Sequence, residues 1–227
     1  MDGQDPDLSA VTLDGSTSGI VRLRLPPGQT RWRGTIGIPA DLVVPQDAEL
    51  VVEPGTTVRF GLDATGRGVE PQLTELTVEG RLTVAGDAGD EVTFGLDPAA
   101  GDAIWYGIAM AGPAHVDIRY LSLELAAFGL IGTVDRAGSL AVADSRFSRC
   151  AVNGLRLTVN GTASVARTTL TTHRQQGLRV DGSGELVLEE VEAADNGREG
   201  VLIGNAGVRA RGLRVVNLSP GATDTPF

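Results

Sequence analysis

The residues of this sequence best suited to nucleophilic or acid–base chemistry are its one cysteine, Cys150, and its two histidines, His115 and His173. Cys150, His173 and Asn196 are equally spaced along the chain. A thiol, an imidazole and an amide in contact form a nucleophile, a base and an orienting group. Equal spacing also fits one position of a repeated turn, where small polar side chains bond to the turn backbone. We favour the turn interpretation, and we predict no catalytic residue.

Two arginines and a nearby aspartate form the candidate ligand-binding group. Arg156 and Arg179 are separated by the same interval as Cys150 and His173, and Asp181 follows closely after Arg179. If both arginines lie on one outer face, an anion such as a uronate or a sulfated glycan would relieve their like charges. The alternative is a pair of solvated arginines. The predicted ligand-binding residues are therefore Arg156, Arg179 and Asp181.

Acidic residues form two further patterns. Asp144, Arg167 and Glu190 alternate in sign at this same interval, as in an exposed ladder of ion pairs. A catalytic cluster of two acids and an arginine is the alternative. Other acidic residues lie in turns where calcium could bind, but their spacing matches no calcium loop. They are Asp87, Asp90, Glu91, Asp97 and Asp102. We expect neither a metal nor another cofactor.

The elements that position these side chains follow from an internal repeat. Cuts before His115, Ser139, Thr162, Glu185 and Gly207 divide the chain into successive units of nearly equal length. Each unit carries three short segments of alternating hydrophobicity, separated by brief turns. Apolar residues then recur in columns, such as Val116, Leu140, Ala163, Leu186 and Val208, or Ile118, Val142, Val165, Leu188 and Ala210.

A repeat of this kind predicts a solenoid. Parallel crossover connections are right-handed in about 98% of cases. We therefore predict an all-β, single-stranded right-handed parallel β-helix with coils of about 22–26 residues. The N-terminal half follows the same pattern with longer turns at residues 61–74 and 95–103. We predict one β-helix over residues 19–218, between an N-terminal tail at 1–18 and a C-terminal tail at 219–227.

The order of short motifs between Arg31 and Val216 resembles a known superfamily. The motifs are Trp32-Arg33-Gly34, Val43-Val44-Pro45, Leu50 to Phe60, Leu76 to Leu82 and Trp105-Tyr106-Gly107-Ile108. They are similar to the opening of bacterial surface β-helix domains of the pectate-lyase-like superfamily. Its members are mostly secreted, so the resemblance implies an extracellular or cell-surface protein. It implies no single activity, because the superfamily includes lyases, hydrolases, epimerases, adhesins and spacer domains.

Composition excludes several kinds of partner. The formal net charge is −10, and all 19 basic residues are arginine. An acidic chain repels nucleic-acid phosphates and anionic lipids, so we expect no nucleic-acid partner. No apolar run is long enough for a transmembrane helix, so we expect no membrane insertion. The segment at positions 1–20 lacks the basic and apolar regions of a signal peptide, which leaves either a cytosolic protein or a removed signal.

The motifs of familiar β-helix enzymes are missing from the sequence. Neither histidine lies in the Gly-His-Gly of polygalacturonase-like hydrolases, and the Asp-Pro-His-Asp of alginate-epimerase-like enzymes is absent. The turns after residue 115 are also too short to wall a cleft. We therefore expect a non-catalytic module of a secreted or surface protein, acting as a spacer, adhesin or assembly subunit. The alternatives are a carbohydrate-active enzyme or glycan-binding domain acting on an acidic polysaccharide, and a cytosolic scaffold polymer.

The ends of a solenoid determine its partners, because their strands have no next coil to pair with. At the N-terminal end, residues 19–25 can form a capping strand. At the C-terminal end, Leu213, Val215 and Leu218 are expected near an open apolar face, which predicts a longer polypeptide, self-association or docking. The expected partners are other protein subunits through the terminal coils, or a glycan.

Overall fold

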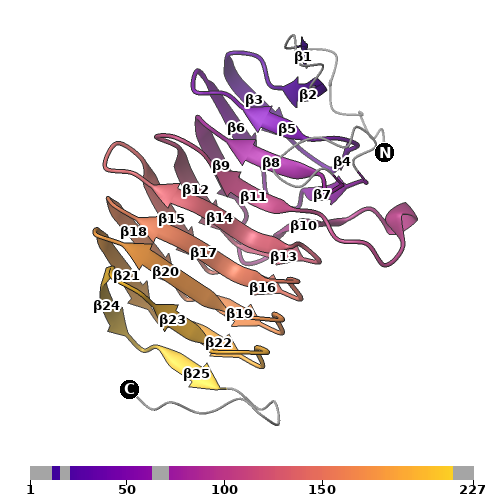
Figure 1. The fold of residues 1–227 in the computed structure, drawn as a ribbon. Helices are drawn as coiled ribbons and strands as arrows, with labels where there is room; N and C mark the ends of the chain where they lie inside the picture. Colours follow the sequence, from indigo (N-terminus) through magenta and orange to yellow (C-terminus); the bar gives the residue numbers. More distant parts are fainter. Residues whose placement is uncertain (1–11, 16–20, 63–71, 217–227) are drawn as a thin grey trace.

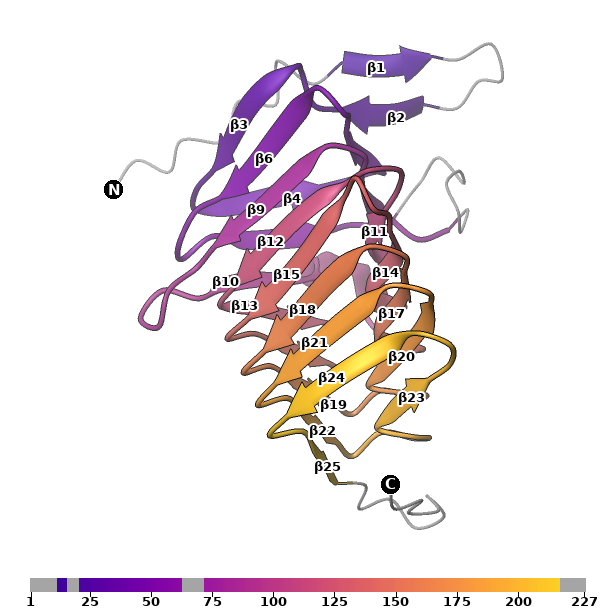
Figure 2. The same cartoon turned by 90° about the vertical axis from the view of Figure 1, so that its left-hand side faces the viewer.

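The chain folds as a parallel β-solenoid of three sheets, which wind in the expected right-handed sense (Figures 1 and 2). The computed structural model describes residues 12–15, 21–62 and 72–216. Each coil contributes one strand to each sheet, and there are about eight coils. Equivalent strands of successive coils are hydrogen-bonded in parallel, as the repeat of the sequence predicts. The prediction of the fold is therefore confirmed.

The strands of the three sheets are as follows. Sheet A contains β1 (Thr12–Gly15), β2 (Val21–Arg24), β5 (Leu42–Val44), β8 (Glu75–Val78), β11 (Gly107–Met110), β14 (Phe128–Val134), β17 (Asn153–Val159), β20 (Leu178–Gly182) and β23 (Val201–Ile203). Sheet B contains β3 (Gly28–Trp32), β6 (Ala48–Val52), β9 (Arg81–Ala85), β12 (His115–Arg119), β15 (Ser139–Ala143), β18 (Thr162–Ala166), β21 (Glu185–Glu189) and β24 (Gly207–Arg211). Sheet C contains β4 (Thr35–Ile38), β7 (Thr57–Phe60), β10 (Val92–Leu96), β13 (Leu121–Glu124), β16 (Arg146–Ser148), β19 (Thr169–Thr171), β22 (Glu192–Ala194) and β25 (Arg214–Val216).

The core is a set of aliphatic columns that run along the solenoid axis. Val142 pairs with Val165, and Val165 pairs with Leu188, as the columns of the sequence predict. All three side chains are buried. Alternate residues of each strand point inward, which explains the period-2 pattern. Burial of one such side chain contributes about 1.5–3 kcal/mol, so the stacked columns offset much of the ordering entropy.

The N-terminal coils hold a cluster of buried aromatic residues. The rings of Phe60 and Trp105 stack with centroids 3.8 Å apart and planes 2° apart. Phe94 meets the edge of this pair. The indole Nε1 of Trp105 donates a 3.0 Å hydrogen bond to the carbonyl of Glu124, so its polar atom is satisfied although the residue is buried.

Two columns of turn residues have left-handed backbone conformations. One column, between sheets B and C, contains Tyr120, Asp144, Arg167 and Glu190, with φ angles between 43° and 51° for the first three and 53° for Glu190. The other, at the end of sheet C, contains Leu125, Arg149, Thr172 and Asp195, with φ angles between 53° and 58°. Such angles are uncommon outside glycine and cost about 1–2 kcal/mol per residue. The strand pattern of the sequence did not reveal them.

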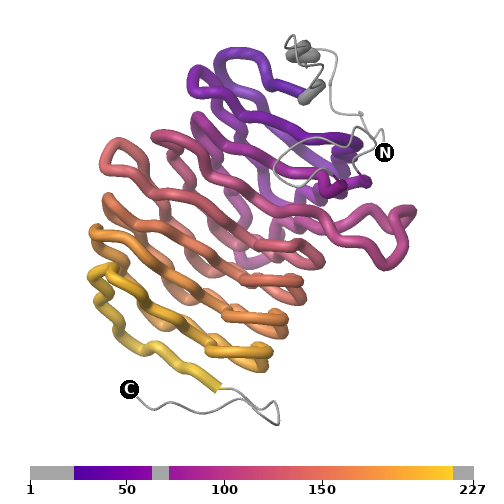
Figure 3. Tube along the Cα trace, viewed as in Figure 1, coloured from indigo at the N-terminus to yellow at the C-terminus, as the bar shows by residue number. Residues whose placement is uncertain are grey.

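The two ends differ. At the N-terminal end, β2 pairs in parallel with β5 and antiparallel with β1. Residues 21–24 therefore extend sheet A, and a strand lies inside the segment predicted as a tail. The longer turn between β10 and β11 contains the short 3-10 helix η2 (Pro98–Ala100) and projects from the body (Figure 3). Residues 63–71 of the other predicted long turn, at 61–74, lie outside the described residues, as do Leu218 and the predicted C-terminal tail.

Within the described ranges, no helix is long and apolar enough to cross a membrane.

Candidate functional site

Cys150, His173 and Asn196 come together in the structure, as a column of turn residues after sheet C. All three are buried. The backbone N–H of Cys150 donates to Nδ1 of His173 over 3.1 Å, and the backbone N–H of His173 donates to Oδ1 of Asn196 over 3.1 Å. The side chains of His173 and Asn196 therefore each accept a hydrogen bond from the backbone of the coil before them. This confirms the turn interpretation of their equal spacing.

The bonding pattern fixes the tautomer of His173. Because Nδ1 accepts a hydrogen bond, the ring proton of the neutral imidazole lies on Nε2. Among the described residues, Nε2 has no hydrogen-bond partner of normal geometry. In the next coil, Nδ2 of Asn196 donates to the carbonyl of Leu170 over 3.1 Å. Phe147 pairs in register with Leu170, so its carbonyl occupies the corresponding position near His173.

The electrostatics of this column oppose nucleophilic catalysis. Burial raises the pKa of the Cys150 thiol to about 12, so the reactive thiolate is scarce at neutral pH. Burial also lowers the pKa of His173 to about 4, and the nearby Phe147 carbonyl only partly opposes this effect. The Sγ of Cys150 lies 3.7 Å from the carbonyl of Ser148 and makes a weak hydrogen bond there. A neutral thiol beside a neutral imidazole in a closed turn is a structural arrangement.

A second polar column, which the sequence patterns did not reveal, runs beside the first. Nδ2 of Asn153 donates to Oε1 of Gln176 over 2.9 Å, and Nε2 of Gln176 donates to Oε2 of Glu199 over 2.6 Å. The bond from Gln176 lowers the pKa of Glu199. The equal spacing of these three residues along the chain is the signal from which this ladder could have been predicted. Asn153 and Gln176 are buried, whereas Glu199 is exposed. The ladder therefore connects two buried amides to a carboxylate at the surface.

Arg156 and Arg179, the predicted ligand-binding arginines, are direct neighbours on the outer face of β17 and β20. Each guanidinium has a contact within the protein. That of Arg156 lies over the ring of Phe128, 5.7 Å from its centroid, and Nε of Arg179 lies 3.3 Å from Oδ2 of Asp181. These contacts relieve part of the like-charge repulsion that motivated the anion hypothesis. The binding of an acidic glycan to Arg156, Arg179 and Asp181 stays a prediction.

Of the two ion pairs expected in the ladder, the one between Asp144 and Arg167 is formed. Arg167 donates from Nε and Nη2 to the two carboxylate oxygens of Asp144 over 2.6 and 2.7 Å. These bonds lower the pKa of Asp144. Glu190 attracts the guanidinium from a longer distance. All three lie in the left-handed turn between sheets B and C. The cluster is part of a turn surface.

Two of the acidic turn residues have local structural roles. Oδ1 of Asp87 accepts hydrogen bonds from the backbone of Gly89 and Asp90 over 2.9 and 3.0 Å. Oδ1 of Asp97 accepts one from Ala99 over 2.8 Å and caps the 3-10 helix η2. These are side-chain turns that aspartate commonly forms. The described residues contain no group of three or more histidine, cysteine, aspartate or glutamate side chains arranged to hold a metal ion.

Two of the shallow grooves that the described residues form lie near candidate residues. One, of about 510 Å³, lies at the corner of sheets A and B and is lined by Gln29, Glu49, Glu79, Arg81 and His115 among others. Nδ1 of His115 lies 3.0 Å from Oγ of Ser139, within reach of a hydrogen bond. The other groove, of about 450 Å³, lies between the turn at residues 101–104 and the column of Arg149 and Thr172. The longer turn of the sequence prediction does wall this second groove.

The His115–Ser139 contact lacks the other parts of a catalytic site. A serine nucleophile needs an oriented base and donors for the developing oxyanion. In the part of the chain that the structure describes, no carboxylate is hydrogen-bonded to His115. Both side chains stand on the outer face of sheet B, and neither is buried. The groove is therefore a polar surface depression.

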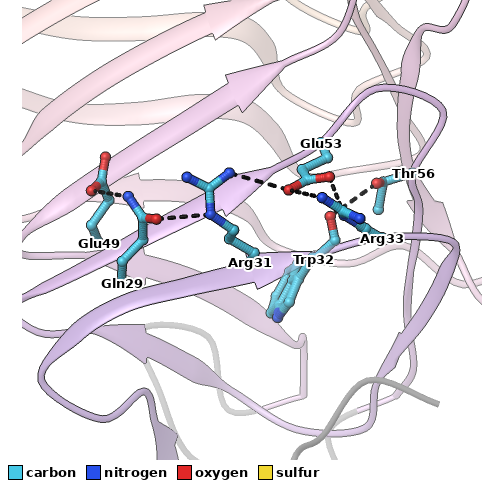
Figure 4. Close-up of polar contacts among 7 residues, drawn as sticks. All are labelled: Gln29, Arg31, Trp32, Arg33, Glu49, Glu53 and Thr56. Atoms are coloured by element: carbon cyan, nitrogen blue, oxygen red, sulfur yellow. Dashed lines mark hydrogen bonds and ion pairs between the residues drawn. The ribbon is translucent and has the colours of Figure 1, made fainter. Parts of the chain in front are cut away.

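The outer face of the first two coils carries a polar network (Figure 4). Nε2 of Gln29 donates to Glu49 over 2.8 Å, and Nε of Arg31 donates to the carbonyl oxygen of Gln29 over 2.8 Å. Arg31 and Arg33 both reach Glu53, whose pKa they lower. One carboxylate thus joins two arginines, across adjacent coils. The network is solvent-exposed and links the first two strands of sheet B, β3 and β6, and the turns that follow them.

The chain matches no family model, no curated protein and no solved structure in comparisons with known proteins. The structure supports the predicted parallel β-solenoid, and no comparison confirms the pectate-lyase-like superfamily.

Proposed function

We propose that this chain is a non-catalytic structural module, which joins another protein subunit through its C-terminal coil. This is the spacer or assembly-subunit role that the sequence favours. The exported location and the superfamily membership that the motifs imply belong to the proposal as well. Its main support is the face that the last coil, β23 to β25, presents at the end of the solenoid.

The last coil presents positions to solvent that are buried in every coil before it. Leu188 and Ala193 are buried, whereas Ala210 and Val215, one coil further, are exposed. Val215 exposes 43% of its surface. Val208 and Leu213 are half-buried against the core. Within the described residues, β23, β24 and β25 are also the terminal strands of the three sheets.

An apolar surface beside strand edges is a docking surface for further strands. A partner that adds strands to the three sheets would bury Ala210 and Val215 as Leu188 and Ala193 are buried one coil earlier. The remaining candidate sites favour this role, because each polar cluster described above satisfies its own turn or strand. A module of this kind contributes length, rigidity and an interface.

Light scattering on the purified chain tests the proposal. At about 1 M NaCl charge repulsion between copies is screened, so we expect association that grows with concentration. The variant Leu213→Arg with Val215→Arg should remain monomeric, because it places two charges in the apolar face. Leu62→Arg, at another exposed leucine, is the matched control and should behave as the wild type. A wild-type chain that stays monomeric at every concentration, scatters like the double variant and also binds no strand peptide at its C-terminal coil would contradict the proposal.

A further inference from the structure

The last two coils alternate in charge, and this alternation identifies the kind of strand that fits beyond them. On β24 and β25 the outward side chains of Arg209, Arg211 and Arg214 are exposed. The coil before presents glutamates: Nε of Arg209 lies 2.9 Å from Glu185, and Nη1 of Arg214 lies 3.3 Å from Glu192. Arg211 pairs in register with Glu189. Each arginine of the last coil is thus matched to a carboxylate on one side.

The opposite side of each arginine faces the position of a next strand. Adjacent strands lie about 4.8 Å apart, so a further strand would meet the arginines at the same spacing as the glutamates do. The side chains of Arg209 and Arg214 are 80% and 68% exposed and are open to a second carboxylate. Arg167 already has this arrangement within the solenoid, with Asp144 in the coil before and Glu190 in the coil after.

The register of sheet B disfavours the opening coil of a second copy as the partner. Following the paired residues from strand to strand places Arg31 of β3 in the same column as Arg209 of β24. Stacking of one copy on another in this register would bring Arg31 onto Arg209, with Arg33 close by. Like charges directly opposite each other in adjacent strands are destabilising.

We propose that the C-terminal coil accepts a β-strand of another polypeptide, with acidic outward side chains and aliphatic inward ones. The inference rests on the proposed function, since it names the chemistry of the partner that docks at this face. The aliphatic residues cover Ala210 and Val215, and the acidic ones lie between the arginines and solvent. The solenoid itself contains such a strand pair in the coil of β21 and β22, which carries Glu185, Glu189 and Glu192 outward.

A peptide that copies residues 185–195 is therefore the probe, and the control peptide replaces Glu185, Glu189 and Glu192 by glutamine. Binding of both labelled peptides to the wild-type chain is measured by fluorescence anisotropy. At about 50 mM NaCl we expect the acidic peptide to bind about five- to tenfold more tightly than the control, from three added cross-strand pairs. At about 0.5 M NaCl the difference should shrink, because exposed pairs are screened.

Protein variants locate the effect. Arg211→Glu with Arg214→Glu should abolish the preference for the acidic peptide. Arg146→Glu should leave it unchanged, because Arg146 occupies the same outward column three coils earlier. Equal binding of both peptides, lost in the Leu213→Arg and Val215→Arg variant, would overturn the acidic partner and leave the proposed function standing. Stable self-association at low salt would identify a second copy instead and overturn the inference. If neither peptide binds and the chain never associates, both proposals fail.

Discussion

Replacement of His173 by asparagine should remove a specific part of the acid sensitivity of this protein. The neutral imidazole is held in the core by the backbone N–H of Cys150, and burial lowers its pKa from 6.5 to about 4. Above pH 6.5 the ring is neutral in both states, so it adds no pH dependence. As the pH falls below 6.5, the unfolded chain takes up a proton that the folded chain does not bind until about pH 4. Stability is therefore lost across this window and levels off below it.

The expected size of the loss follows from the two pKa values. With a pKa of 6.5 in the unfolded chain and about 4 in the folded one, His173 lowers the free energy of unfolding, relative to pH 7, by about 2 kcal/mol at pH 5 and about 3 kcal/mol at pH 4. Asparagine does not titrate. Its Oδ1 can accept from Cys150 and its Nδ2 can donate to Phe147, as Asn196 does one coil later. At pH 7 the variant should therefore lie within about 1 kcal/mol of the wild type.

Urea unfolding of both proteins between pH 7 and pH 4 is the assay. Carboxylates whose pKa is lowered by their partners, such as Asp144 and Glu199, also destabilise the fold at low pH. Their effect is the same in both proteins, so the difference between the two pH profiles isolates His173. His115→Asn, at an unburied ring, serves as the control and should keep the wild-type profile. Identical profiles for the wild type and His173→Asn would refute the assignment of a buried neutral imidazole.

Two substitutions and one activity assay test other parts of the structure. Val165→Asp should lower the free energy of unfolding by more than about 3 kcal/mol, because it places an unpaired charge in a buried aliphatic column, and a melting curve like that of the wild type would contradict the packing. Thr172→Gly should raise it by about 0.5–1 kcal/mol, since an exposed β-branched residue has a φ of 58° there; a loss of stability would show that its side chain contributes more than the strain costs. The purified protein should not degrade polygalacturonate or alginate, with or without calcium, and new reducing ends or unsaturated products that disappear in Arg179→Ala would reverse this expectation.

The strand columns were predictable from the sequence because their cause is local and repeated. Inward positions such as Val142, Val165 and Leu188 must be apolar in every coil, so the period appears directly in the chain. The interpretation of Cys150, His173 and Asn196 as turn residues succeeded for the same reason. Equal spacing in a solenoid implies equal environment.

The turns and the side-chain partners were less accessible to sequence reasoning. The left-handed angles of Tyr120 and Thr172 are imposed by the change of direction between sheets, and neither residue type signals such a conformation. Arg156 contacts Phe128 in the adjacent coil, and the distance between these two residues along the chain differs from the repeat length. The partners of Arg156 and Arg179 therefore needed the register of sheet A, which the structure supplied.

The glycine in the coil before His173 links the composition of one turn to that of the next. A Cβ at Gly154 would lie 2.5 Å from Nε2 of His173, so the bulk of the imidazole requires glycine at that position. Column positions in adjacent coils therefore constrain each other, and a coil is exchangeable only together with its contacts to the coil before it. Removal of residues 162–184 would delete one whole coil and let Asn196 accept the hydrogen bond of Cys150 directly, but it would also bring Asp144 onto Glu190. Each such deletion shortens the rod by one step of about 4.8 Å, so the length of this molecule changes by whole coils and never by single residues.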